Sequence, residues 1–301
     1  MQIKAPVIGA QEDLAVRSNT ERAYSAAIES FENWGGLLPA SRMQLENYID
    51  FMNGKGFSEN TKSLRLNAVK RWNKVNGFDV PSVFVKKASS TKKAKPITIE
   101  IIKKVEETMS NSDLMTDLRD LSLILLGFFR GFRADELVRL NVQDVQIKKG
   151  GVIITLPFTK ESKGEKSFFI QRLDSLCPVS AIDKWINKAS ISHGPLFRSI
   201  NRWGDIGENR LHINSINPLL RSALYRAGIC DAESYSSHSM RRGFATWANE
   251  SGVCIHSIMG YIGWKTVSVA VGYADNFHER IRPVCINSLL TINQDNQHSI
   301  E

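Results

Sequence analysis

Hydrophobic residues in the first 85 positions recur every three or four residues, which is the spacing of helices that bury one face. A first helix is predicted to begin at Ser18 or Asn19 and to end at the glycine pair 35–36. Its apolar side consists of Tyr24, Ala27, Ile28, Phe31 and Trp34. A second helix is predicted over residues 42–52, ending at Gly54, and a third after Ser58. The pattern predicts a small all-helical domain.

The third predicted helix combines an apolar side with many basic residues. Leu64, Ala68, Trp72 and Val75 fall on one side. The basic residues elsewhere on its surface are Lys62, Arg65, Lys70, Arg71 and Lys74. A basic helix of this kind is either a solvated face or a surface that contacts nucleic acid, and the sequence pattern leaves both interpretations open.

Residues 97–288 follow a different pattern. Helices are predicted over 97–109 and 114–129, and the second is apolar on nearly every side, which indicates a buried helix. Residues 152–158 and 167–171 are rich in β-branched and aromatic residues around a polar turn, which indicates a hairpin. Further helices are predicted over 178–188, 214–227, 239–250 and 255–259, with a last one around Tyr273. We therefore expect a mainly α fold with a small antiparallel β-sheet.

The distribution of charge indicates where a domain boundary lies and which class of partner the protein binds. The 301 residues carry 39 Lys and Arg against 31 Asp and Glu, a formal net charge of +8 that favours polyanionic partners. Five lysines and no acidic residue fall within 86–95: Lys86, Lys87, Lys92, Lys93 and Lys95. We interpret 86–96 as an extended linker, which is either a plain tether or a strap along a phosphate backbone.

Membrane and secreted classes are disfavoured. The longest apolar stretch, residues 121–129, is far shorter than the roughly 20 residues that cross a bilayer. The first residues lack the hydrophobic segment of a secretory signal. Cys177, Cys230, Cys254 and Cys285 are widely spaced without a CxxC pair, so neither a zinc ribbon nor a disulfide scaffold is indicated. We expect a cytoplasmic protein.

Three segments contain residues that could carry chemistry. In 236–253, His238 and Arg241 lie three apart near the start of a helix and could share one anionic ligand, or form an ordinary surface pair. In 127–145, Arg133 follows the break at Gly131, where Glu136 either orients it by a fork-to-fork ion pair or forms a purely structural pair with it.

In the third segment, residues 256–275, Trp264 precedes Tyr273 by nine positions. Taken alone, a tryptophan and a tyrosine at this spacing more often belong to the hydrophobic core than to a functional site.

Taken in order, these segments resemble the signature of the tyrosine recombinases, the phage integrase family. GFRADEL resembles its first arginine motif, HSMRRGFAT its H-x-x-R box, and IGW with the following Tyr273 its His/Trp position and nucleophile. The polar turn TKESKGEK resembles the hairpin that carries the family's lysine. SNTERAYSAAIESFENW and FSENTKSLRLNAVKRWNKVNG are similar to its helical core-binding domain. Several motifs in order across most of the chain are far more specific than any one of them.

The resemblance implies a Xer-, resolvase- or Cre-like enzyme of simple architecture. The implied domains are a SAM-like helical core-binding domain (1–85), the linker (86–96), a catalytic domain (97–288) and a tail (289–301) that either docks on a neighbouring protomer or is frayed. The implied reaction is site-specific DNA strand exchange through a 3'-phosphotyrosyl intermediate, without metal or nucleotide cofactor.

The resemblance also implies roles for individual residues. Tyr273 is the nucleophile, with Tyr261 as the nearest alternative, and His238 is the general base. Arg133, Arg241 and Trp264 bind the phosphate, and Glu136 supports Arg133. Lys160 protonates the leaving group, with Lys163 and Lys166 as rivals. The expected DNA-contacting residues are Lys62, Arg65, Lys70, Arg71, Lys86, Lys87, Lys92, Lys93 and Arg242, although a solvent-facing Arg242 is an equal alternative.

The implied partners are double-stranded DNA with paired recombination sites, a homotetramer on synapsed DNA and accessory DNA-bending proteins in the nucleoid. Two other functions are considered. A type IB topoisomerase uses a similar residue set, but the helical N-terminal domain and the nine-residue Trp-to-Tyr interval favour the recombinase. A catalytically silent DNA-binding accessory protein is disfavoured by the complete set of catalytic residue types.

Overall fold

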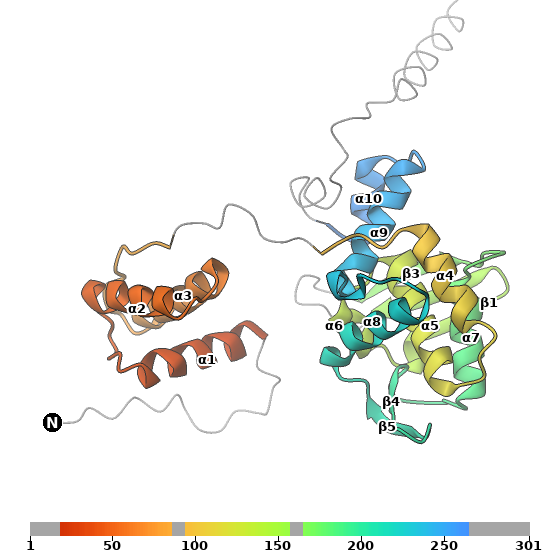
Figure 1. The fold of residues 1–301 in the computed structure, drawn as a ribbon, viewed down its shortest axis with the longest axis horizontal. Coiled ribbons are helices and arrows are strands. Elements are labelled where there is room, and N and C mark those ends of the chain that lie inside the picture. The colour runs from red at the N-terminus through yellow and green to blue at the C-terminus, as the bar shows by residue number, and fades with distance from the viewer. Residues whose placement is uncertain (1–18, 86–93, 157–164, 265–301) are drawn as a thin grey trace, which may run out of the picture. The chain divides into compact units, whose positions relative to one another are not determined.

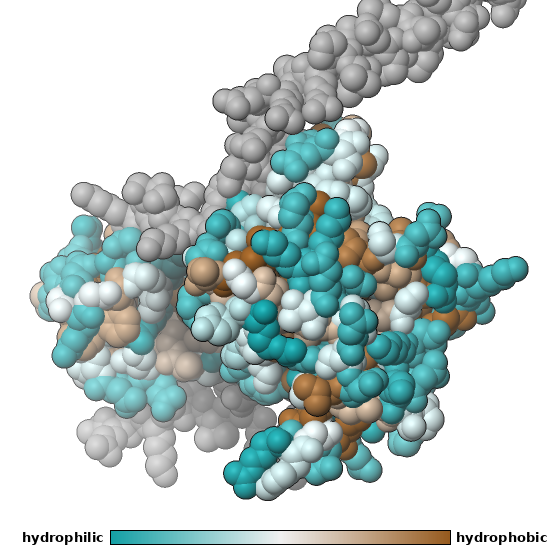
Figure 2. Space-filling model, turned by 45° about the vertical axis from the view of Figure 1, so that its right-hand side comes forward, coloured by the Kyte–Doolittle hydropathy of each residue, from teal (hydrophilic) through white to brown (hydrophobic). Residues whose placement is uncertain are grey.

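The computed structural model describes residues 19–85, 94–156 and 165–264, and the chain divides into two compact units at Lys92 and Lys93 (Figure 1). The last predicted helix, around Tyr273, lies outside the described residues. No helix in the described ranges is long and apolar enough to cross a membrane. On the face drawn in Figure 2, hydrophilic residues predominate and hydrophobic ones form separate patches.

Residues 19–85 of the first unit form three helices, as predicted: α1 (Asn19–Asn33), α2 (Arg42–Gly54) and α3 (Glu59–Val75). Ser41 and Ser58 cap α2 and α3 by accepting hydrogen bonds from the N–H groups of Gln44 and Thr61. The helices enclose a core of Phe31, Ala40, Leu45, Tyr48, Met52, Leu66, Val69 and Val83.

The predicted apolar side of α3 is partly wrong. Leu64 and Val75 are exposed, whereas the buried face carries Leu66 and Val69. Asn73 lies on that face too, where its side chain exchanges hydrogen bonds with the backbone of Ala40 at 2.9 and 3.1 Å. A polar residue satisfied in this way ties the end of α3 to the α1–α2 connection, which hydrophobic spacing alone does not reveal.

The second unit surrounds helix α5 (Met115–Arg130), which is buried over almost its whole length, as predicted. The other α-helices are α4 (Ile99–Met109), α6 (Ala134–Arg139), α7 (Pro178–Lys188), α8 (Ile216–Arg226), α9 (Ser237–Glu250) and α10 (Ile255–Ile262). Short 3-10 turns lie at Val142–Asp144, Ile213–Ser215 and Ala232–Ser234. Helices α4, α7, α8 and α9 pack against α5.

The described part of this unit also contains two antiparallel sheets. The first has the order β1 (Val145–Lys148), β2 (Gly151–Leu156) and β3 (Lys166–Gln171), and the β2–β3 pairing confirms the predicted hairpin. The second pairs β4 (Arg198–Ile200) with β5 (Ile206–Arg210). Strands β1, β4 and β5 were not predicted, because runs of three to five residues contain too few alternations to be recognised.

The end of the predicted linker belongs to the second unit. The backbone N–H of Lys95 donates to the carbonyl of Ser234, and its ammonium pairs with Asp231 at 2.8 Å. Two residues later, the N–H of Ile97 donates to the carbonyl of Ser239 at 3.1 Å. Lys95 is therefore fixed to the protein rather than part of a free tether, a correction to the expected extent of the linker.

Candidate active site

The first predicted arginine lies where α5 breaks. Gly131 adopts the left-handed conformation, with φ 63°, and ends α5; Arg133 is the residue that precedes α6. Nη1 of Arg133 donates to Oε1 of Glu136 at 2.9 Å, and the backbone N–H of Arg133 donates to Oε2 at 2.7 Å. Glu136 thus holds Arg133 through one side-chain and one backbone bond, instead of the fork-to-fork pair considered above. The arginine side chain remains 44% exposed and able to meet a ligand.

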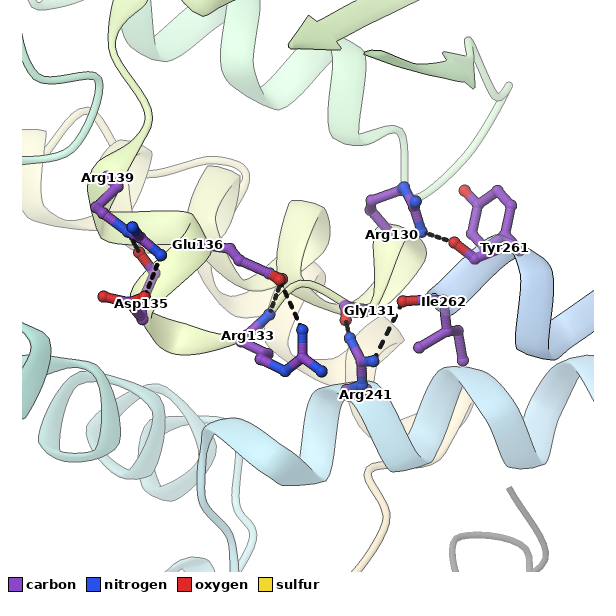
Figure 3. A network of polar contacts seen from close by, with 9 residues as sticks. All are labelled: Arg130, Gly131, Arg133, Asp135, Glu136, Arg139, Arg241, Tyr261 and Ile262. Atoms are coloured by element: carbon purple, nitrogen blue, oxygen red, sulfur yellow. Dashed lines mark hydrogen bonds and ion pairs between the residues drawn. The ribbon is translucent and has the colours of Figure 1, made fainter. Parts of the chain in front are cut away.

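Helix α9 brings the second predicted arginine to the same turn. Arg241 is buried, and its guanidinium donates to the carbonyls of Gly131 and, at 3.1 Å, Ile262 (Figure 3). On the same helix, Gly243 lets the backbone of Ile97 pack directly on α9, because a Cβ there would lie 2.0 Å from the carbonyl oxygen of Ile97. Arg241 therefore joins the α5–α6 turn to the end of α10.

His238 lies one turn before Arg241 on α9, where its side chain reaches the surface while part of the ring is covered. Partial burial lowers the pKa of its imidazole below the ordinary value of 6.5, and the charges of Arg241 and Arg133 lower it further. Both guanidinium groups therefore act on this one imidazole. A histidine in these surroundings is neutral at pH 7 and can accept a proton.

Trp264 follows the left-handed turn at Gly263 that ends α10. It is buried in a small cluster with Ala245, Ala248, Ile258 and Ile262, and its ring centroid lies 5.6 Å from the Arg241 guanidinium carbon. Trp264 is therefore part of a small core, as one interpretation of the sequence had it, and it also lies close to Arg241, a predicted catalytic residue.

Several predicted site residues lie outside the described residues: Lys160, Lys163, Tyr273, Lys86, Lys87, Lys92 and Lys93. Lys166 is described and lies exposed at the start of β3. No group of three His, Cys, Asp or Glu side chains within 19–85, 94–156 and 165–264 could hold a metal ion.

The basic residues of α3 differ in availability. Lys62 is buried, with its ammonium bound to Glu59 and Asn53, and is therefore left out of the DNA-contacting set proposed below. Arg65 lies over the ring of Phe57 at 4.4 Å, and Lys70 donates to the carbonyl of Val83. Arg71 is exposed.

Arg242 is only 4% exposed, so its solvent-facing alternative is wrong. It follows Arg241 on α9, and Gly243, next along the helix, lies directly against the Ile97 backbone. Arg241 beside it is buried to the same extent, so burial alone does not decide whether Arg242 contacts a phosphate, and that contact stays a prediction.

Sequence reasoning missed Arg130, and it weighed Tyr261 only as a nucleophile. The hydroxyl of Tyr261 donates to the carbonyl of Phe129 at 3.0 Å, and burial raises its pKa, against a smaller opposing effect of Arg130. A phenol held in this way is poorly suited to attack. The guanidinium of Arg130 lies 4.5 Å from the ring centroid of Tyr261. The only sequence signal for Arg130 was a charge at the end of an apolar helix.

Comparison with known proteins agrees with this fold. The model of the phage integrase family matches residues 84–280. An integrase/recombinase xerD homolog of Selenomonas ruminantium is 28% identical over 283 residues, covering 85% of this chain and 81% of the relative. Recombinase cre of Escherichia phage P1 is 22% identical over 265 residues, covering 79% and 77%.

Among solved structures, the XerH site-specific recombinase bound to a palindromic difH substrate aligns with a TM-score of 0.65 at 16% identity, covering 88% of this chain and 78% of that one. At this identity the alignment shows the shared fold. The family match spans well over half of the residues, so the chain belongs to the phage integrase family and is a tyrosine recombinase. The predicted family and fold class are confirmed.

Proposed function

We propose that this recombinase cleaves and rejoins double-stranded DNA at specific sites, with Tyr273 as the nucleophile. The carrying observation is the convergence of Arg133, His238 and Arg241 around the turn at Gly131. The phenol oxygen of Tyr273 attacks the scissile phosphorus, the bond to the 5'-oxygen breaks, and a 3'-phosphotyrosyl enzyme with a free 5'-hydroxyl results. A second 5'-hydroxyl then attacks the phosphorus of the phosphotyrosine, the bond to the Tyr273 oxygen breaks, and the strand is rejoined as the phenol regains its proton. The phosphodiester bond energy is conserved, so the reaction needs no nucleotide hydrolysis.

In this proposal His238 accepts the phenol proton. A free tyrosine has a pKa of about 10, so attack at neutral pH requires a base. The lowered pKa of His238 supports this role, because it keeps the imidazole unprotonated at pH 7.

Arg133 and Arg241 bind the non-bridging phosphate oxygens, where negative charge builds in the transition state. Donors that are already fixed stabilise that charge most effectively, because they do not have to reorganise during the reaction. The bonds from Arg133 to Glu136 and from Arg241 to two backbone carbonyls supply this fixation. The indole of Trp264, beside Arg241, contributes a further donor.

We assign protonation of the 5'-oxygen to Lys160, with Lys163 and Lys166 as alternatives in the same hairpin. Arg65, Lys70 and Arg71 of the first unit, with the linker residues Lys86, Lys87, Lys92 and Lys93, contact the DNA backbone. The enzyme acts in the cytoplasm, associated with the nucleoid, as a homotetramer on two paired sites, with accessory DNA-bending proteins.

A plasmid that carries two copies of the enzyme's own site, located as inverted repeats beside its coding region, tests this function. We expect recombinant products in which the flanking segments are excised or inverted, depending on the orientation of the sites. Relaxation of the plasmid without any exchange product would indicate topoisomerase activity, and DNA binding without either product would indicate an accessory protein.

A further inference from the structure

Arg130 is the last residue of α5, and its side chain is buried between aromatic rings. Its guanidinium carbon lies 3.8 Å from the ring centroid of Phe168 and 4.5 Å from that of Tyr261, and Phe132 lies on a further side at 5.5 Å. Its Nη1 donates to the carbonyl oxygen of Tyr261 (Figure 3). The whole residue is only 4% exposed.

Burial in this environment costs the positive charge of Arg130 its hydration. Within the described residues, the hydrogen bond of the Arg130 guanidinium goes to a backbone carbonyl rather than to a carboxylate, and its buried Nε has no hydrogen-bond acceptor. The ring faces, one carbonyl and the negative charge of Glu136 offset part of the loss of hydration, but burial still lowers the pKa of the guanidinium. A hydrophobic residue at this position would avoid that cost, so stability alone does not account for an arginine here.

The contacts of Arg130 connect three elements that surround the candidate site. Phe168 belongs to β3, Tyr261 belongs to α10, and Arg130 itself immediately precedes the turn that carries Arg133. Arg130 binds the carbonyl of Tyr261, while Arg241 binds that of the next residue, Ile262. Two guanidinium groups thus hold successive carbonyls at the C-terminus of α10, where the helix dipole favours positive charge.

Trp264 lies two residues after Ile262, the second of these two carbonyl-bonded residues. Its backbone N–H and that of Gly263 both donate to the carbonyl of Met259, at 2.9 and 2.7 Å. The turn into Trp264 therefore continues directly from the end of α10 that the two arginines bind. The position of Trp264 relative to Arg241 therefore depends on how firmly α10 is held.

We propose that Arg130 is a positioning residue for DNA cleavage, which holds the end of α10 and strand β3 against the turn that carries Arg133. The inference rests on the proposed function, because the positioned groups are the proposed phosphate ligands. The rings of Phe168, Tyr261 and Phe132 enclose the Arg130 guanidinium, so Arg130 acts through these rings and the backbone rather than on the DNA itself.

The test compares Arg130→Lys with the matched variant Arg119→Lys. Arg119 is a buried arginine on the same helix that donates to Asp120 and to the carbonyl of Arg198, away from the site residues. Cleavage of a nicked substrate is measured in single turnover at saturating enzyme, and the dissociation constant for the same DNA is measured separately.

We expect Arg130→Lys to slow cleavage at least tenfold while changing the dissociation constant less than threefold, because lysine keeps the charge but not the planar stack. Arg130→Met, which keeps the bulk without charge, is expected to behave in the same way. Arg119→Lys is expected to cleave at the wild-type rate. Wild-type cleavage by Arg130→Lys, or equal slowing in the two lysine variants, would overturn the inference.

Hydrogen exchange gives a measurement that does not depend on activity. The amides of Gly263 and Trp264 are expected to exchange at least tenfold faster in Arg130→Lys than in wild type or Arg119→Lys. Unchanged exchange would overturn the inference even if cleavage were slow. If wild-type enzyme formed no covalent complex with DNA, the proposed function would fail, and hydrogen exchange would still decide whether Arg130 holds α10.

Discussion

The carboxylate of Glu136 binds both ends of Arg133, accepting from its guanidinium at 2.9 Å and from its backbone N–H at 2.7 Å. A single amide cannot replace both acceptors, because one of its terminal atoms is a donor. We therefore expect Glu136→Gln to slow single-turnover cleavage about tenfold, equivalent to about 1.4 kcal/mol of transition-state stabilisation, with little change in DNA affinity.

Asp135 supplies the control for this variant, because it pairs with Arg139 on the exposed side of the same helix. Asp135→Asn is expected to cleave at the wild-type rate. Equal rates for Glu136→Gln and wild type would show that Arg133 does not depend on Glu136 for its orientation.

The pKa of His238 predicts the acid side of the pH–rate profile. Burial, followed by the charges of Arg241 and Arg133, lowers this pKa, so the imidazole becomes protonated only below its ordinary value of 6.5. Protonation removes the proposed base, and the single-turnover rate should therefore fall as the pH drops through a value below 6.5. His238→Gln should be slow at all pH values and lack this acid limb. A limb above pH 6.5, or one that persists in His238→Gln, would assign the titration to another group.

The linker lysines predict the salt dependence of DNA binding. Replacing Lys86, Lys87, Lys92 and Lys93 by Gln should reduce the slope of log affinity against log salt by about 0.9 for each of these lysines that binds a phosphate. Lys95→Gln is the matched control, because Lys95 already pairs with Asp231, and it should leave the slope unchanged. A slope that stays the same in the fourfold variant would identify 86–93 as a plain tether.

Asp120 predicts a pH dependence of stability in the second unit. Burial raises its pKa from 3.8 to about 6, although it pairs with Arg119 at 2.7 Å. Because the folded state binds this proton more tightly, the contribution to the free energy of unfolding is complete below pH 3.8 and is lost as the pH rises through 6.

Asparagine does not titrate, so Asp120→Asn does not lose stability in this pH range as the wild type does. Relative to wild type, its free energy of unfolding should therefore rise by up to about 3 kcal/mol between pH 4 and pH 7. Urea unfolding at the two pH values measures the difference, with exposed Asp113→Asn as the control. Parallel pH profiles of Asp120→Asn and wild type would contradict the predicted pKa.

Local signals in the sequence were enough to predict most helices. Ser58 marks the start of α3, Gly131 the end of α5, and Pro178 the start of α7, because capping and helix-ending residues act within one turn. The buried face of α3 was predicted less well. Its Leu64 and Val75 are apolar but face solvent, whereas the polar Asn73 lies on the buried face and bonds to the backbone of Ala40.

In the candidate site, too, residues within local motifs were predicted, whereas a residue defined by distant contacts was not. Arg133, His238 and Arg241 were predicted from motifs, and the structure brings them to one turn. Arg130 was not predicted, because its environment comes from Phe168 and Tyr261, and the latter lies 131 positions away in the chain. No local pattern encodes such a contact.

Covalent trapping on a nicked suicide substrate tests the central claim most directly. When the short cleaved fragment diffuses away, the enzyme remains attached to the 3' end, and mass spectrometry of the digested complex identifies the attached residue. We predict a DNA-linked peptide that contains Tyr273, no trapping by Tyr273→Phe despite normal DNA binding, and continued trapping by Tyr261→Phe. DNA attached to another residue, or equal trapping by Tyr273→Phe, would contradict the account.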